Sequence, residues 1–194
     1  LEFLDVSRRE RLDLYRPRHG RSPWPTAIFL HGGAFHRGDK ASERSRTLCR
    51  LLAQAGIAAL SVNYQLSKSS LGDDRWQAWP TNLLDAAAAV RFACSQAQAY
   101  DLDPSRIAVV GTSAGGTLAL LLAFGAADAL GGEQVSSRIK AVVNFYGRVD
   151  WTQHTVKRKI PSSAEISRDA SPLTWIARSQ AEPPSVLTFH GDDD

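Results

Sequence analysis

The chain contains no methionine and only two cysteines among its 194 residues, and it lacks the features of several other protein classes. Its longest apolar stretch, residues 118–127, is about half the length needed to cross a bilayer. No charged and then apolar leader comes before that stretch, and no acidic, basic or low-complexity block indicates a disordered tail. These absences favour a soluble globular domain without a membrane span.

A strong charge of either sign is also missing. The net charge is +3, from scattered Lys and Arg residues, and the short basic patch at 157–159 adds little attraction for polyanions. We therefore expect no nucleic-acid partner, whereas an oligomer is compatible with the composition. The chain starts at Leu1, which indicates a fragment of a longer protein, so a missing leader favours no particular compartment. Cys49 and Cys94 fall in different predicted helices, and we expect both to be free, buried thiols.

Short β-type runs alternate with longer helical stretches along the chain. This pattern predicts an α/β fold in which a mainly parallel sheet has helices on both faces. At this length it predicts a single domain, residues 1–194. Strands are expected at 11–15, 26–30, 57–62, 107–110, 139–145 and 186–190, and helices at 41–55, 80–100 and 114–127. A polar loop is expected at 67–74, and the long excursion at 147–183 predicts a cap or an active-site insertion.

The central motif is Gly111-Thr112-Ser113-Ala114-Gly115-Gly116, placed between an apolar strand and a helix. The sharp strand-to-helix turn strains the serine, and it closes only where small residues stand at 111, 115 and 116. The hydroxyl of Ser113 is then exposed at the carboxyl end of the sheet, beside a helix N-terminus that favours developing negative charge. The alternative is a tight glycine-rich turn that carries an inert serine.

A second motif, His31-Gly32-Gly33-Ala34-Phe35, directly follows another buried strand. Acyl transfer needs backbone N–H donors where the carbonyl oxygen becomes negative, and a glycine-rich turn offers them. We predict that Gly33, Ala34 and Ala114 form this oxyanion hole. His31 precedes the nucleophile, and we expect it to hold the loop by hydrogen bonding rather than to act as the base.

The pairing of HGGAF with GTSAGG resembles the α/β-hydrolase esterases of the hormone-sensitive-lipase and carbohydrate-esterase type, which include acetyl xylan and feruloyl esterases. Further similar stretches are HRGDK at 36–40, VNYQLS at 62–67, YDLDPSRIAVVGTSAGG at 100–116, NFYGRVD at 144–150, ASPL at 170–173 and PPSVLTFHGDDD at 183–194. The resemblance implies the α/β-hydrolase fold and ester hydrolysis without a metal or an organic cofactor. The chain departs from the family at Asn63 and Gln65, which puts one supporting salt bridge in question.

The resemblance also implies the catalytic acid, which stands four residues after the histidine of the last HG-x-x-D motif. Counting from His190 gives Asp194, with Asp192 and Asp193 as neighbouring alternatives and Asp150, after an earlier strand, as another. In this fold the base is a histidine that follows the acid, and all five histidines of this chain precede Asp194. His154 would reach the site only through an unusual rearrangement.

The missing base leads to an expectation about the parent protein. We expect it to continue for about 30 to 50 residues, the scale of one βα unit that supplies the histidine, the last strand and the last helix. Without that unit, a sheet edge and an apolar face would be exposed.

The predicted activity is serine ester hydrolysis of a small molecule with a short acyl group, attached to a carbohydrate or a small alcohol. Amide or peptide hydrolysis, as in formamidases and prolyl peptidases, is the enzymatic alternative. A catalytically silent fold used for binding is the other. The substrate pocket is expected to involve residues 35–40, 67–79 and the excursion, where Trp76 and Trp79 either stack on a ligand or simply pack.

Overall fold

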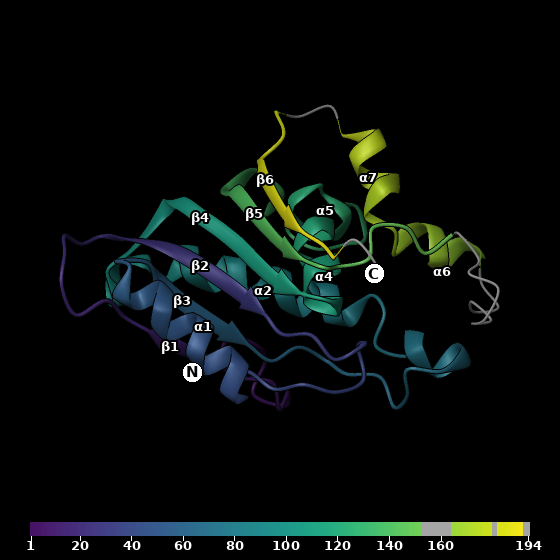
Figure 1. Ribbon diagram of the computed structural model, residues 1–194, viewed down its shortest axis with the longest axis horizontal. Helices are drawn as coiled ribbons and strands as arrows, with labels where there is room; N and C mark the ends of the chain where they lie inside the picture. The colour runs from purple at the N-terminus through teal and green to yellow at the C-terminus, as the bar shows by residue number, and fades with distance from the viewer. Residues whose placement is uncertain (153–163, 180–181, 192–194) are drawn as a thin grey trace.

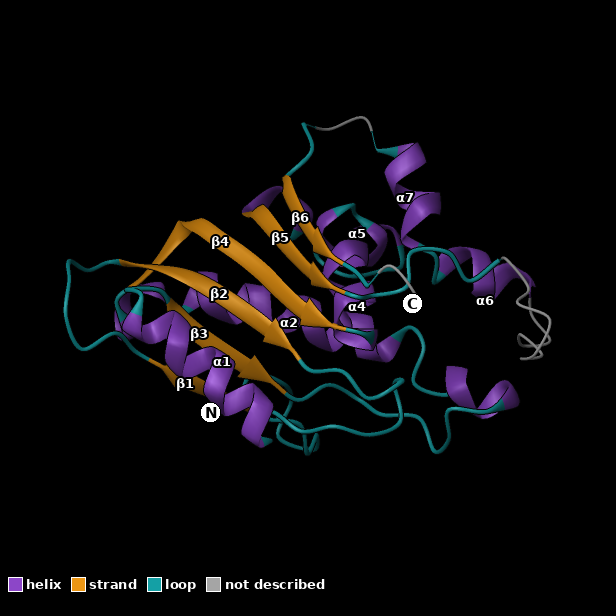
Figure 2. Cartoon of the chain, in the orientation of Figure 1, coloured by secondary structure: helices purple, strands orange, loops and turns teal. Residues whose placement is uncertain are grey.

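The computed structural model describes residues 1–152, 164–179 and 182–191, which form one sheet between helices (Figures 1 and 2). The strands are β1 (Leu12–Tyr15), β2 (Trp24–Leu30), β3 (Ala58–Val62), β4 (Leu102–Thr112), β5 (Ile139–Phe145) and β6 (Ser185–Phe189). The α-helices are α1 (Glu43–Gln54), α2 (Thr81–Ser95), α3 (Ala97–Tyr100), α4 (Ala114–Ala123), α5 (Ala126–Ala129), α6 (Ala164–Asp169) and α7 (Pro172–Arg178). Two 3-10 helices, η1 (Gly72–Trp76) and η2 (Ser136–Arg138), lie in the connections.

The sheet has the order β1-β3-β2-β4-β5-β6, and only β1 runs antiparallel to its neighbour. The predicted mainly parallel sheet is therefore confirmed. In register, Leu30 of β2 pairs with Gly111 of β4, and Gly111 pairs with Asn144 of β5. The residues that follow these strands are thus brought to one edge of the sheet.

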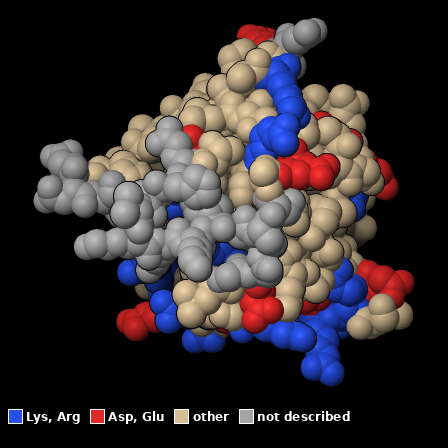
Figure 3. Space-filling view, turned by 90° about the vertical axis from the view of Figure 1, so that its right-hand side faces the viewer, with Lys and Arg blue, Asp and Glu red and all other residues tan. Residues whose placement is uncertain are grey.

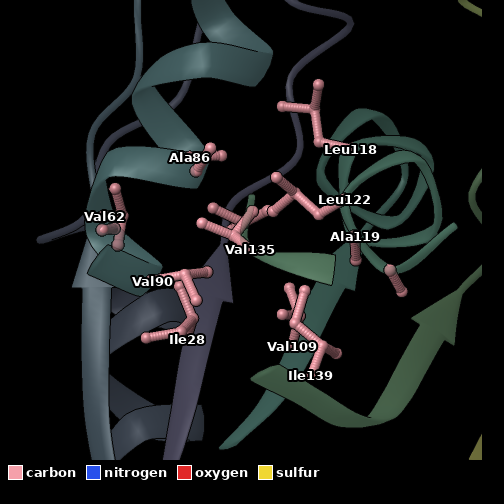
Figure 4. Close-up of a cluster of buried hydrophobic side chains, with 14 of the residues drawn as sticks. Ile28, Val62, Ala86, Val90, Val109, Leu118, Ala119, Leu122, Val135 and Ile139 are labelled. Carbon is pink, nitrogen blue, oxygen red and sulfur yellow. The ribbon is translucent and has the colours of Figure 1, made fainter. Parts of the chain in front are cut away.

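Helices cover both faces of the sheet, as the sequence predicts (Figure 2). Because side chains alternate along a strand, Phe29 packs with the α1 face, which includes Cys49, whereas Ile28 and Leu30 pack with α2 and α4. Figure 4 shows the larger cluster, in which Val109 and Ile139 of the sheet meet Leu122 of α4. Every residue of α4 is buried, as expected for a helix that is apolar on all sides.

Three predicted boundaries were wrong. The helix predicted at 80–100 is two helices, which break at Gln96, and the helix predicted at 114–127 ends earlier because Gly125 adopts a left-handed conformation (φ 85°). Strand β4 starts at Leu102 rather than at residue 107, since its first part pairs with Trp24 of β2. The predicted polar loop at 67–74 includes the start of η1.

Both cysteines are free thiols, as predicted. Cys49 is buried under the sheet, and this burial raises its pKa to about 12. Cys94, near the end of α2, is only half-buried, so the prediction that both are buried was wrong for this residue. Burial also raises the pKa of Cys94.

Strand β6 is the least covered strand that the structure describes. Val186, Leu187 and Phe189 are 45%, 53% and 48% exposed, although the ring of Phe189 stacks on that of Phe145 with centroids 4.9 Å apart. Apolar side chains of β6 are therefore exposed at the edge of the described sheet.

The core position Leu121 provides a test of this packing. Leu121→Ala should lower the free energy of unfolding by about 2 to 5 kcal/mol, because the side chain is fully buried and its loss leaves a cavity. Leu51→Ala is the matched control, since Leu51 is 59% exposed on α1, and it should change stability by less than about 0.5 kcal/mol. Urea unfolding of both variants measures the difference, and equal losses would contradict the assigned core.

Candidate active site

Ser113 is the single residue between the end of β4 and the start of α4. Its backbone has φ 51° and ψ −118°, a conformation that a residue with a side chain adopts only under strain. Its N–H donates a hydrogen bond of 2.8 Å to the carbonyl of Phe145, at the end of the neighbouring strand β5. The side chain is partly exposed, so the bend presents the hydroxyl at the carboxyl edge of the sheet.

The three glycines around Ser113 lie where the chain packs too closely for a Cβ atom. A Cβ atom at Gly111 would overlap the carbonyl of Gly115 in the first turn of α4, and one at Gly115 would overlap the carbonyl of Leu30 in β2. A Cβ atom at Gly116 would overlap Oδ1 of Asn144. The predicted requirement for small residues at these positions thus has a direct cause, which is contact of the first turn of α4 with β4, β2 and β5.

Residues 32–35 form a turn beside Ser113. Gly33, Ala34 and Phe35 have successive positive φ values of 130°, 53° and 64°, and the carbonyl of Gly33 accepts hydrogen bonds from the N–H groups of His36 and Arg37, both at 3.1 Å. A Cβ atom placed on Gly32 would lie 3.3 Å from Cβ of Ser113. The turn and the serine are therefore in contact, as the two motifs predicted.

The predicted oxyanion donors remain free for a ligand. Within the described part of the chain, the N–H groups of Gly33, Ala34 and Ala114 donate to no protein acceptor. Ala114 is the first residue of α4, where N–H groups have no partner within the helix.

His31 holds the turn, as predicted. Its Nδ1–H donates to the carbonyl of Gly32 at 2.8 Å, and its ring stacks on Tyr64, whose hydroxyl donates to the carbonyl of His31 at 2.6 Å. Nε2 is buried without a hydrogen-bond partner, and burial lowers the pKa of the imidazole. His31 is thus a neutral side chain that is engaged in structure.

An aromatic cluster supports the turn from the other side. Phe35 is 3% exposed, and its ring lies 6.2 Å from Trp76 and 5.9 Å from Trp151. Trp76 is 6% exposed and meets the ring of Trp79 edge-on at 6.3 Å. Of the two roles considered for Trp76 and Trp79, packing is therefore the one that the structure supports.

Ser67 fastens this cluster to the turn. Its N–H donates to the carbonyl of Phe35 at 2.8 Å, and its hydroxyl donates to the carbonyl of Arg75 at 2.7 Å while it accepts from the N–H of Ala78 at 3.1 Å. No local motif predicts this role, because all three partners are brought to Ser67 by the tertiary fold.

An ion pair between Arg8 and Asp85 lies beside Gln65, one of the two positions where the chain departs from the family. The N–H of Gln65 donates to Oδ2 of Asp85 at 2.8 Å, and the guanidinium of Arg8 donates to the same oxygen at 2.6 Å. Burial raises the pKa of Asp85, and the bond from Arg8 opposes that rise. Arg8 lies in the N-terminal segment, and the sequence analysis did not predict its pairing with Asp85.

A cavity of about 500 Å³ opens beside Ser113. Besides the turn, its lining includes Arg37, Asp39, Arg44 and Tyr146. Neither Arg44 nor Tyr146 was predicted to line the site, although Tyr146 belongs to the family-like stretch at 144–150. Figure 3 views the molecule from the side toward which the parallel strands point, and shows Lys and Arg both in its upper part and along its lower part, with Asp and Glu among them.

The remaining predicted residues are placed as follows. Asp192, Asp193 and Asp194, together with His154 and the basic patch at 157–159, lie outside the described residues. Asp150 accepts hydrogen bonds from the N–H and the hydroxyl of Thr152, at 2.8 and 2.6 Å, in a local turn.

In the described ranges, no group of three or more His, Cys, Asp and Glu side chains is arranged to hold a metal ion. Similarly, no described helix is long and apolar enough to span a membrane.

A mainly parallel sheet between helices, with a strained serine at a strand-to-helix bend, defines the α/β-hydrolase fold. Residues 12–194 match the sequence model of the BD-FAE family, and the chain belongs to this family.

Proteins of similar sequence include esterase LipC of Mycobacterium tuberculosis, 32% identical over 100% of this chain and 48% of the relative. A second is the probable carboxylic ester hydrolase LipM of the same organism, 29% identical over 98% of this chain and 44% of the relative. The chain thus spans about half the length of these relatives.

Solved structures agree with the fold. A truncated carbohydrate esterase from gut microbiota is 25% identical, with a TM-score of 0.72 over 93% of this chain and 71% of that one. Esterase 2 of Thermogutta terrifontis, phosphonylated by sarin, is 22% identical, with a TM-score of 0.76 over 97% of this chain and 70% of that one. This second likeness concerns the fold alone.

The buried state of His31 predicts a dependence of stability on pH. Its pKa is lowered in the folded state from 6.5, so the unfolded chain binds the proton more readily, and this residue's contribution to stability is lost as pH falls below about 6.5. His31→Gln should therefore lose less unfolding free energy than the wild type between about pH 8 and about pH 5.

His19→Gln is the matched control, because His19 is exposed, and it should keep the wild-type dependence. Urea unfolding at several pH values provides the measurement. An unchanged pH dependence in His31→Gln would contradict the assignment of His31 as a buried neutral side chain.

Proposed function

We propose that the protein is a serine hydrolase of carboxylic esters that works through an acyl-enzyme on Ser113. The observation that carries this proposal is the contact between the strained serine and the turn at 32–34, whose N–H groups have no acceptor among the described residues. The names of the relatives LipC and LipM support ester chemistry in the same family.

In the first step, the hydroxyl of Ser113 attacks the ester carbonyl and its proton passes to a base. The carbonyl oxygen becomes negative, and the N–H groups of Gly33, Ala34 and Ala114 stabilise it. One such donor is worth about 3 to 4 kcal/mol of transition-state stabilisation. The alcohol then leaves with the proton, and water releases the acid in a second step of the same kind.

The base in this scheme is the histidine that the family resemblance places after the acid, oriented by Asp194. His31 is unsuited to the role, because its Nδ1–H is used by Gly32 and its ring is buried against Tyr64. Without a base, a serine hydroxyl is a weak nucleophile at neutral pH.

Residues 147–183 belong to the same proposal as a cap or insertion over the site. In its described parts, the N–H of Trp151 donates to the hydroxyl of Ser171 at 2.7 Å, and the N–H of Leu173 donates to the carbonyl of Val149 at 3.1 Å. Trp151 also packs on Phe35 of the turn. The insertion is thus connected to the proposed oxyanion hole.

The proposed substrate is an ester with a short acyl group, on a carbohydrate or a small alcohol. The cavity of about 500 Å³ lies in the range of small-molecule sites. The similar fold of the carbohydrate esterase from gut microbiota supports a sugar ester. Comparing acetylated sugars with aryl formamides and dipeptide amides distinguishes this substrate from the amides of the alternative activity.

Ser113→Ala in the full-length protein should lower the turnover of 4-nitrophenyl acetate by a factor of about 10⁴ or more, since the nucleophile is removed. Ser137→Ala is the control, because Ser137 is exposed in η2, away from the cavity lining, and it should retain wild-type turnover.

A fluorophosphonate probe gives a second measurement on the same variants. Mass spectrometry should find the label on Ser113 alone, and Ser113→Ala should remain unlabelled. Turnover that survives Ser113→Ala, or labelling of another serine, would refute the assignment.

A further inference from the structure

The cavity beside Ser113 carries an excess of positive charge in its lining. Arg37 and Arg44 contribute two guanidinium groups, whereas Asp39 is the one carboxylate among the lining residues. His31 also lines the cavity, but burial lowers its pKa and keeps it neutral. The lining thus bears a net positive charge next to the nucleophile.

The carboxylate of Asp39 does not neutralise the two arginines. Its Oδ1 accepts from the N–H of Ala41 at 2.6 Å, and its Oδ2 accepts from Nδ2 of Asn63 at 2.9 Å. Among the salt bridges of the described residues, none involves Arg37 or Arg44. Both guanidinium groups therefore lack an anionic partner within the described chain.

Arg44 is held at the cavity by the turn that follows β5. Its Nη1 donates to the hydroxyl of Tyr146 at 3.1 Å, which connects the first turn of α1 to that turn. Tyr146 itself has a positive φ of 44°, and its N–H donates to the carbonyl of Phe189 at 2.7 Å. The preceding residue, Phe145, accepts the hydrogen bond from the N–H of Ser113. The C-terminal end of β5 thus positions both Ser113 and Tyr146, the residue that binds Arg44.

Arg37 is connected to the oxyanion turn in a similar way. Its N–H donates to the carbonyl of Gly33 at 3.1 Å, so the backbone that carries this guanidinium is fixed to a proposed donor residue. The two arginines come from different elements and line the same cavity. A guanidinium group offers parallel N–H donors that match the two oxygens of a carboxylate.

We propose that this cavity selects esters that carry a carboxylate close to the reacting carbonyl, with Arg44 and Arg37 as the residues that bind it. The inference rests on the proposed serine ester hydrolysis and names the substrate class for it. A neutral substrate would leave both guanidinium groups without a counter-charge, whereas a carboxylate would receive charge-assisted hydrogen bonds from them. The carboxylate belongs either to the acyl group or to the alcohol, and the experiment distinguishes these two sources.

The test uses pairs of esters with matched carbon skeletons, of which only one carries a carboxylate, with the full-length protein. On the acyl side, the mono-4-nitrophenyl ester of adipate is compared with 4-nitrophenyl hexanoate, which has the same chain length. On the alcohol side, 3-acetoxybenzoate is compared with 3-acetoxybenzamide. The measured quantity is the ratio of kcat/KM for the charged ester to that for its neutral partner.

In one of the two pairs, the ratio should favour the charged ester in the wild type and fall about tenfold in Arg44→Gln, as for the loss of a charge-assisted hydrogen bond. Arg37→Gln should lower it in the same direction. Arg46→Gln is the matched control, since Arg46 is also exposed on α1 but does not line the cavity, and its ratio should equal that of the wild type. Added salt should weaken the preference, because it screens exposed charges.

Hydrolysis of the neutral esters separates this inference from the proposed function. If the wild type hydrolyses them but prefers neither charged ester, or if the preference survives both arginine substitutions, the inference is overturned and the proposed function stands. If no ester is hydrolysed and Ser113 takes up no fluorophosphonate, both are overturned.

Discussion

The contact between the N-terminal turn of α4 and the ends of β2 and β5 is the constraint on which the site depends. Gly115 lies against the carbonyl of Leu30, and Gly116 lies against the side chain of Asn144, so neither position has room for a Cβ atom. Because α4 begins this close to the sheet, the chain turns within the single residue Ser113. The turn that follows Leu30 therefore lies against Ser113, and the two glycine motifs are brought together.

The strain of this arrangement is held by packing at some distance from the serine. The positive φ values of Ala34 and Phe35 are unfavourable for residues with a side chain, and such strain persists only where the surroundings enforce it. Phe35 is buried between two tryptophans, and Ser67 binds its carbonyl. The backbone N–H groups of the turn are therefore preorganised before any ligand arrives, which is the condition for electrostatic stabilisation of an oxyanion.

The sequence predicted those features whose signals are local. The fold class, the strands, the bend at Ser113 and the turn at 32–34 follow from apolar runs and from glycines at fixed spacing. Ser67, Arg44 and Tyr146 were missed because each has a partner far away in the chain, at Phe35, Tyr146 and Phe189 respectively. The helix ends at Gln96 and Ala123 were missed because apolar residues continue beyond both, which hid the breaks from a periodicity argument.

The charges around Ser113 also affect the role of the acid in the proposed triad. Arg37 and Arg44 favour the negative oxygen that forms during acyl transfer, but they disfavour the imidazolium that forms when a histidine takes the serine proton. A carboxylate against that histidine offsets the repulsion and fixes its tautomer. In a cavity with this charge, the acid of the proposed triad therefore stabilises the protonated base as well as orienting it, so loss of Asp194 should be more costly here than beside a neutral cavity.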